Sequence, residues 1–527
     1  MKEFIKKHWF IILIIIISLI RFFFSCNIPS FYITNLKYDD KLMINQMINI
    51  SNGEYLGNYS NVTLVKGVIF PLLLALIRLI KGSYSVIFTL LYILSSLYFT
   101  LSCKKITNNK IILIITYIVL LFNPLTYSSE LFQRLYVNTI SIPELLIFLG
   151  LLIRILYDKK DKILNYILFG IISGIMLITR NDNIWIYIIL IILFIIKLYK
   201  KININKIIIN LIPIVTIFII MTIFSSINYM YYKTFTYNEL ENSSFKDAYN
   251  SILKIKNNNT NDKVSITKDT LLELSEKSSV INMSKEIIEA GYKNRDDFEY
   301  DDGNMIWFFR FLVYSTQNFK DGKEANDYFK NLHDDIERLF KENKLERRNT
   351  LPTLYTTSLS LNNIKKIPSA LYEAIIYTST YQNVKTYPID MIKNDIRFMY
   401  SKNYNSYTLA YYDYRYAENI IKNNSMPYEI IRIIYKYLTC ILSIISLIVY
   451  IINIKKKDNL NTLTHLILLI YLIILGGVVY TDISAFHAIR YRYLANVYIL
   501  QSIFIILNLI RAYNNKYFTK IKQIIKK

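Results

Sequence analysis

The sequence predicts a mainly α-helical protein, a polytopic bundle of about ten transmembrane helices with a mostly helical domain inserted outside the membrane. Three observations support this prediction. The chain of 527 residues is 53% hydrophobic and has a mean hydropathy of +0.28. Its apolar residues gather in repeated runs long enough to cross ~30 Å of hydrocarbon at about 1.5 Å per helical residue. Short lysine clusters separate these runs, as is typical of loops that orient membrane helices.

The apolar runs define the expected spans in order along the chain. The first run follows Lys2, Lys6 and Lys7 and has no small-residue cleavage site after it, so we expect a retained helix. The stretch KGVIFPLLLALIRLIKG, from Lys66 to Gly82, is apolar for only about thirteen residues, which favours a helix in the outer interface. The expected spans lie at about 9–25, 84–102, 110–125, 140–157, 163–179, 184–199, 206–226, 430–453, 462–480 and 491–512.

The distribution of charge predicts how the chain is oriented. The net charge is +23, which in a soluble protein would suggest a nucleic-acid partner. Here the basic residues lie in alternate loops, so we expect no nucleic-acid partner and a multi-pass protein of the cytoplasmic membrane with both termini cytoplasmic. The expected parts are an N-terminal membrane module at 1–227, an extracytoplasmic domain at 228–428 and C-terminal membrane helices at 429–527.

The expected extracytoplasmic domain holds most of the acidic residues and has helix-like patches. The stretch MIWFFRF, residues 305–311, is more typical of the core of this domain than of a sugar-stacking platform, which remains the alternative. In DYFKNLHDDIERLFKEN the apolar positions have helical spacing, at Tyr328, Phe329, Leu332, Ile336, Leu339 and Phe340.

Ionisable residues near the expected span ends gather on the outer side. Such residues are costly near lipid and tend to mark substrate or ion pathways, so we expect an outward-facing cavity of mixed charge. They are Asp39, Asp40, Lys66, Glu130, Arg134, Arg180, Asp182, Asp482, His487, Arg490 and Arg492.

Asp39 and Asp40 are the candidate acid–base residues. Adjacent carboxylates repel each other, so in a partly desolvated site one of them should have a raised pKa and could act as a general base or share a metal. A solvated acidic turn after a helix is the simpler alternative on spacing alone.

The basic candidates also have structural alternatives. In TRND, Arg180 and Asp182 either orient a phosphate or serve as an interface anchor and a helix cap. Arg490 and Arg492 are two residues apart, so on a regular helix at most one should point into a shared cavity. His487 has no second histidine at metal-binding spacing, which favours a hydrogen-bonded interface residue.

The order of these features resembles the GT-C superfamily of integral-membrane glycosyltransferases, which includes protein O-mannosyltransferases and aminoarabinose transferases. The matching pieces are a first span, an outer loop with an acidic pair (YDDKLM), a Gly-containing stretch (NGEYLGNYSNVTLVKG), an interfacial helix with Pro71, then TRNDNIW and finally RYRYLANVYI. No WWDYG-like motif occurs, which argues against the oligosaccharyltransferase branch. The inserted domain indicates a less characterised bacterial branch.

The resemblance implies transfer of a sugar from a polyprenyl-phosphate donor to a cell-envelope glycan, lipid or protein on the outer face of the membrane. It implies a general base at Asp39 or Asp40. A single base favours inversion at the anomeric carbon, whereas a second carboxylate at Asp40 or Asp182 would permit retention. A divalent cation remains open as a cofactor. The implied substrate-binding residues are Lys66, Arg134, Arg180, Asp182, Arg490, Arg492 and Tyr493.

Two functions from other classes also fit an outward-facing polar cavity. A transporter or flippase of lipid-linked saccharides would often show internal repeats and broken helices at mid-membrane, and the sequence shows no internal repeat. A non-catalytic scaffold for wall assembly would need fewer spans than about ten. The glycosyltransferase is therefore the favoured interpretation.

Overall fold

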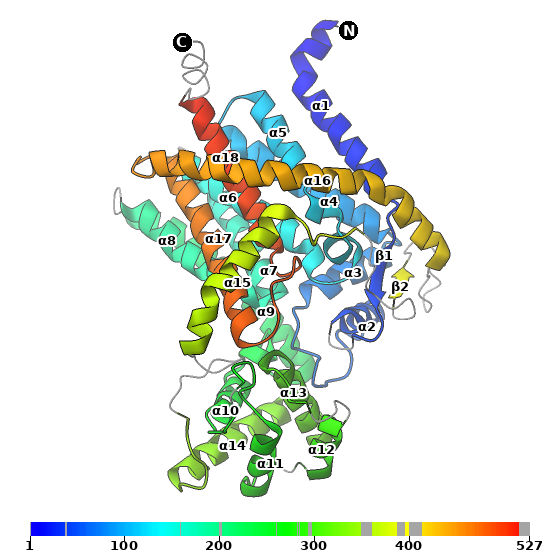
Figure 1. The fold of residues 1–527 in the computed structure, drawn as a ribbon, viewed down its shortest axis with the longest axis vertical. Coiled ribbons are helices and arrows are strands. Elements are labelled where there is room, and N and C mark those ends of the chain that lie inside the picture. Colours follow the sequence, from blue (N-terminus) through cyan, green and yellow to red (C-terminus); the bar gives the residue numbers. More distant parts are fainter. Residues whose placement is uncertain are drawn as a thin grey trace.

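The chain folds into a helical bundle with a smaller helical domain at one end (Figure 1). The computed structural model describes residues 2–36, 39–158, 160–199, 203–259, 261–281, 283, 285–293, 298–348, 361–386, 396–399 and 414–515. Eight helices in this part of the chain are long and apolar enough to cross a membrane. The protein is therefore a mainly α-helical, multi-pass membrane protein.

The bundle consists of helices that match the expected spans in order. Eight of them reach the length and hydropathy of a span, α8 together with the turn before it as Asn181–Tyr199, whereas α5 and α7 are shorter apolar helices, so the number of spans stays a prediction. The helices are α1 (Lys2–Ser25), α4 (Tyr84–Ser102), α5 (Lys110–Leu121), α6 (Asn138–Tyr157), α7 (Ile163–Thr179), α8 (Trp185–Tyr199), α9 (Ile204–Tyr232), α16 (Tyr414–Asn453), α17 (Asn459–Ser484) and α18 (Ala495–Asn514).

The helices differ in how much of their surface the bundle covers. Most residues of α6 and α18 are buried, whereas α9 and α16 expose apolar side chains such as Phe218 and Ile448. Exposed apolar surface is what a membrane helix presents to lipid. Figure 1 shows α16 lying across α17 and α18 at a steep angle. The bundle thus has a covered centre and an apolar outer surface.

Small residues bring α7 and α9 close together. Gly170 and Gly174 lie one turn apart on α7, and a Cβ at Gly170 would lie 2.6 Å from the Cβ of Thr216 and 2.9 Å from backbone of Pro213. This is the close helix approach that a GxxxG pattern permits in membranes.

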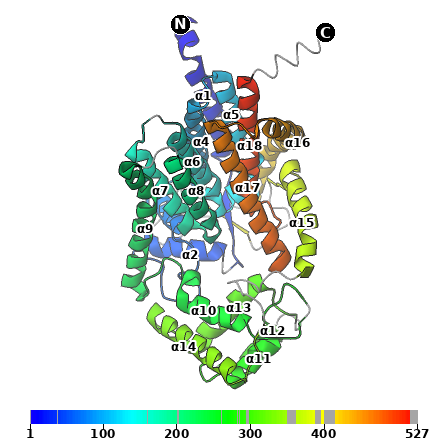
Figure 2. The same ribbon diagram turned by 90° about the vertical axis from the view of Figure 1, so that its left-hand side faces the viewer.

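The helical domain has its own apolar core. It lies at the end of the bundle opposite to the first residues of α1 and the last of α18 (Figures 1 and 2). The spacing prediction for the DYFKNL stretch is confirmed, because Phe329, Leu332, Ile336 and Leu339 are buried on one face of α14. Its helices are α10 (Ser243–Leu253), α11 (Lys268–Lys277), α12 (Lys285–Lys293), α13 (Asp302–Gln317) and α14 (Gly322–Lys341).

Two later elements of the stretch 228–428 return to the bundle. Helix α15 (Leu361–Thr380) packs on α16 and α17, and the Tyr498 hydroxyl of α18 donates to the carbonyl of Tyr377 over 2.9 Å. Strand β2 (Ile396–Met399) pairs antiparallel with β1 (Ser30–Ile33), with Phe31 opposite Phe398. The described helical domain is therefore only the first part of the stretch that the sequence assigns to one domain.

Short elements between the bundle and the helical domain position the polar residues. Figure 1 shows α2 and β1 at this level. The short apolar stretch after Lys66 forms α3, which packs on α2, α4 and α7, and its place in the membrane interface stays a prediction. These elements are α2 (Asp40–Ser51), α3 (Ile69–Leu79), the π-helical turn η3 (Ser129–Gln133) and the 3-10 turns η2 (Pro124–Tyr127), η4 (Asn181–Ile184) and η5 (Glu239–Glu241), while a further 3-10 turn, η1 (Cys103–Lys105), follows α4.

Candidate active site

Asp40 and Arg134 form a buried ion pair. Asp40 lies in the first turn of α2 and is 0% exposed, and Arg134, directly after η3, is 1% exposed. Arg134 donates from Nη2 to Oδ1 over 2.5 Å and from Nε to Oδ2 over 2.9 Å. The N–H of Ile33 donates to the same Oδ2 over 2.9 Å, and the N–H of Leu135 donates to the carbonyl of Phe31 over 2.7 Å. These bonds join α2, β1 and the turn carrying Arg134 into one unit.

Asp39 lies beside this pair but faces a different set of groups. Although it occupies the N-cap position of α2, its side chain makes no capping hydrogen bond. The carboxylate instead accepts from Lys66 Nζ over 3.1 Å and from the Tyr136 hydroxyl over 2.9 Å, and Lys66 Nζ also donates to the Tyr136 oxygen over 3.2 Å. The side chains of Asp39 and Lys66 are 31% and 21% exposed. An aspartate at this position normally caps the helix, so its use elsewhere points to another role.

The two adjacent carboxylates have opposite pKa shifts. Burial alone would raise the pKa of Asp39, but the charges of Lys66 and Arg134 and the hydrogen bonds from Tyr136 and Lys66 lower this pKa to about 2. Burial raises the pKa of Asp40 against the opposing effect of Arg134, and the charge of Asp39 adds a smaller contribution. Burial acts on both carboxylates in the same direction, so the charge and hydrogen bonds of Lys66 and Tyr136, which act on Asp39, separate the two pKa values. Burial also raises the pKa of Tyr136 to about 12, so its hydroxyl stays protonated at neutral pH.

Arg180 lies next to the Asp39 cluster. Its Nε and Nη2 donate to the carboxylate of Asp182 over 2.9 and 2.6 Å, and its Nη1 donates to the side-chain oxygen of Asn138. Burial would lower the pKa of Arg180, but Asp182 raises it, with smaller contributions from Tyr136 and Tyr493. Arg180 therefore lies near Tyr136, which donates to Asp39, and near Tyr493 from the loop before α18.

The loop before α18 brings Arg492 to the turn η3. Arg492 Nε lies 3.9 Å from Oε2 of Glu130, and neither atom has a hydrogen-bond partner among the described residues. Arg492 Nη2 donates to the Tyr493 hydroxyl over 3.1 Å. Arg490 is exposed, so of the two arginines Arg492 is the one that lies against η3.

Asp482 and His487 shape this loop. The Asp482 carboxylate accepts from the N–H groups of Ala488 and Ile489 over 2.7 and 3.0 Å and lies 2.8 Å from Nδ1 of His487. His487 is itself exposed. These bonds hold the turn after α17, so the pair has a structural role there.

The helical domain contributes Trp307 to the same neighbourhood. The Trp307 ring centre lies 5.0 Å from Lys66 Nζ. The sequence predicts that the MIWFFRF stretch lies in the domain core, and Met305, Ile306, Phe308 and Phe309 are buried there. Trp307 is half-buried and faces Lys66 instead.

A buried arginine in the first membrane helix was missed by sequence reasoning. Arg21 is 0% exposed, its guanidinium lies over the rings of Tyr127 and Phe132, and its Nη2 donates to the carbonyl of Thr126. Its Nε and Nη1 have no hydrogen-bond partner among the described residues. The sequence did contain a signal, because a lone arginine within an apolar run is costly in a membrane.

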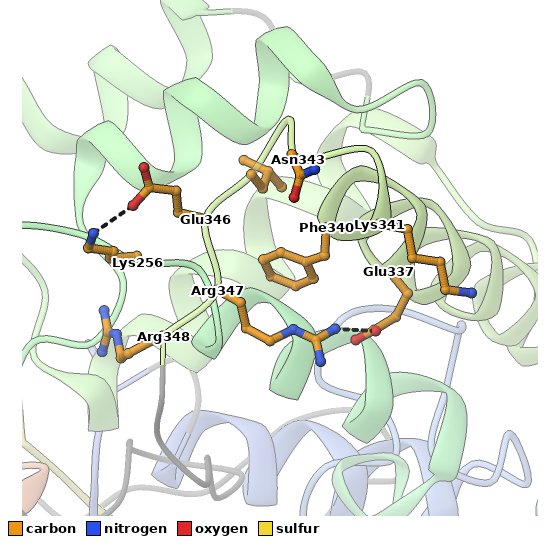
Figure 3. A pocket seen from close by; sticks show the side chains of 9 residues that line it. Lys256, Glu337, Phe340, Lys341, Asn343, Glu346, Arg347 and Arg348 are labelled. Carbon is orange, nitrogen blue, oxygen red and sulfur yellow. Dashed lines mark hydrogen bonds and ion pairs between the residues drawn. The ribbon is translucent and has the colours of Figure 1, made fainter.

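A separate hollow of about 870 Å³ lies on the helical domain at the end of α14 (Figure 3). Two ion pairs cross it, Lys256 with Glu346 at 2.6 Å and Arg347 with Glu337 at 2.5 Å. It contains none of the candidate residues from the sequence. Its lining residues are Lys256, Glu337, Phe340, Lys341, Asn343, Leu345, Glu346, Arg347 and Arg348.

The fold and the polar cluster define a multi-pass helical membrane protein with a charged site at the end of the bundle that carries the helical domain. Comparisons with protein-family models, curated proteins and solved structures find no match. Within the described ranges, no three His, Cys, Asp or Glu side chains gather so as to hold a metal ion. The GT-C resemblance thus stays a prediction.

Proposed function

We propose that this protein is a membrane glycosyltransferase that moves a sugar from a polyprenyl-phosphate donor to a hydroxyl acceptor on the outer face of the cytoplasmic membrane. The observation that carries the proposal is the Asp39 carboxylate. It is partly exposed, does not cap its helix, and accepts hydrogen bonds from Lys66 and Tyr136 at the end of an apolar bundle. A lipid-linked donor requires such a polar site next to membrane helices.

Asp39 is the candidate base. The acceptor oxygen attacks the anomeric carbon, the bond from this carbon to the phosphate oxygen breaks, and the phosphate leaves with the electron pair. The hydroxyl proton passes to Asp39. A carboxylate with a lowered pKa is a weak base for a free alcohol, but the attacking oxygen becomes strongly acidic as it bonds to carbon. Asp39 would therefore accept the proton late in the transfer, with inversion as the expected stereochemistry.

Three cationic groups at this end of the bundle are suited to the departing phosphate, and of these Lys66 contacts Asp39 directly. Lys66 is partly exposed and supplies a point charge, while Arg180 and Arg492 have planar guanidinium groups that can bind phosphate oxygens through two nitrogens. Arg134 is buried and bound to Asp40, so we assign it a supporting role.

Asp40 has a structural task in this proposal. Its carboxylate already accepts from Arg134 and from the backbone of Ile33, and it is fully buried. It fixes the first turn of α2 and thereby directs Asp39 toward Lys66. This leaves the base role to Asp39 alone.

Reconstituted vesicles test the proposal. Purified protein is incubated with radiolabelled polyprenyl-phosphate glucose, mannose or N-acetylglucosamine and with envelope extract as acceptor, and transfer of label is measured. We expect transfer from at least one donor by the wild-type protein. Movement of donor across acceptor-free vesicles, without transfer, would instead identify a transporter or flippase.

The pH dependence of transfer should reveal the influence of Lys66 on Asp39. Because the pKa of Asp39 is lowered to about 2, this base stays ionised from pH 5 to 8 and should cause no loss of activity on the acidic side. The charge of Lys66 lowers the pKa of Asp39 more than any other group does, whereas burial raises it. Lys66→Met removes this charge and keeps the burial, so the pKa of Asp39 should rise. As the pH is lowered, we expect Lys66→Met to lose activity at a higher pH than the wild type does. Activity profiles of equal shape would contradict the assignment of Asp39.

A further inference from the structure

Trp307 is placed at the site by the way α13 docks on the bundle. Trp307, Arg310 and Tyr314 follow at helical positions i, i+3 and i+7 and so share one face of α13. Arg310 donates from Nε to the carbonyl of Asn61 over 2.9 Å and from Nη2 to Glu239 over 2.6 Å. This face therefore lies against the loop that leads to Lys66.

The start of α13 is fixed on the other side of the site. A Cβ added to Gly303 would lie 2.3 Å from the ring of Phe486, so helix and loop touch there. The Phe486 ring in turn packs edge-on against Tyr493 at 5.8 Å. Helix α13 thus contacts both loops that carry candidate residues, and the position of Trp307 is determined by two separate contacts.

We infer that Trp307 is a saccharide-binding platform, on which a sugar ring of the donor or acceptor stacks beside Asp39. The inference rests on the proposed function for the identity of the substrate. An indole face carries negative charge density and attracts the Lys66 ammonium at 5.0 Å. The C–H groups of a sugar ring are weakly positive and bind the same kind of face.

The neighbouring groups favour a sugar over other partners of an aromatic ring. Asp39, Lys66 and the Tyr136 hydroxyl offer an acceptor and donors for hydroxyl groups next to the indole. A quaternary ammonium ligand would be repelled by Lys66. A free phosphate would bind Lys66 and gain nothing from the ring.

Intrinsic fluorescence tests binding without any need for transfer. The chain has three tryptophans, and Trp185 is buried in α8 while Trp9 lies in α1. Titration with polyprenyl-phosphate glucose, mannose or N-acetylglucosamine should change the emission of the wild type and not that of Trp307→Phe. No change with any of the three, or an equal change with sugar-free polyprenyl phosphate, would overturn the inference.

Kinetics separate the platform from a merely structural aromatic residue. Trp307→Ala should raise KM for the sugar substrate about tenfold with a smaller effect on kcat, and Trp307→Phe should restore part of the loss. Phe311→Ala removes an exposed aromatic one turn further along α13 and should leave KM unchanged. An unchanged KM in Trp307→Ala would overturn the platform but not the transferase. Absence of transfer in the wild type would overturn the transferase and leave the fluorescence test to decide the platform.

Discussion

Asp39→Asn should reduce sugar transfer by roughly 10²- to 10⁴-fold, the usual contribution of a general base. The amide has the same shape and still offers an oxygen to Lys66 and Tyr136, so the variant should fold. It cannot take up the proton of the acceptor hydroxyl. Transfer of label from the donor that the wild type uses, measured at equal amounts of folded protein, gives the loss directly.

Glu54→Gln provides the matched control for this experiment. Glu54 is an exposed carboxylate in the same outer loop, so the substitution makes the same chemical change away from Lys66. We expect its transfer rate to equal that of the wild type. If Asp39→Asn also transfers at the wild-type rate, Asp39 is not the base.

Much of the bundle could be predicted from the sequence, because a chain segment of this kind that crosses lipid must be both apolar and helical. Each of the expected spans coincides with a helix, since a long apolar run has no other way to satisfy its backbone hydrogen bonds in a membrane. The packing of α15 and β2 against the bundle could not be predicted in this way. Their packing depends on partners distant in sequence, such as Phe31 opposite Phe398, and no local pattern encodes that pairing.

The sequence could predict that Asp39, Lys66 and Arg134 lie close together, but it could not predict which pairs they form. Asp39, Lys66 and Arg134 each lie near a span end, and the topology places these ends on the same side of the bundle. Which of two adjacent aspartates is buried depends on a contact across 94 residues, between Asp40 and Arg134. The contribution of Trp307 depends on how a separate domain docks, and helical periodicity defines only the face of α13 on which it lies.

Breaking the Asp40–Arg134 pair should destabilise the protein more than any other single change considered. Arg134→Met leaves the buried Asp40 carboxylate without its guanidinium partner, and loss of one member of such a pair costs about 3–5 kcal/mol. We expect a lower unfolding temperature in detergent and a poor yield of folded protein. Arg134→Lys should be intermediate, because an ammonium cannot reproduce the two-nitrogen contact.

The double variant Asp40→Leu/Arg134→Met separates structural support from chemistry. Removing both charges leaves no uncompensated ion, so the double variant should be more stable than Arg134→Met, and the two effects should not add. Additive losses would show that the two side chains do not pair. The Asp40→Leu replacement also removes the hydrogen bond from the Ile33 N–H that fixes the start of α2. We therefore expect transfer to stay below the wild-type rate, because Asp39 is no longer held toward Lys66 even in a folded protein.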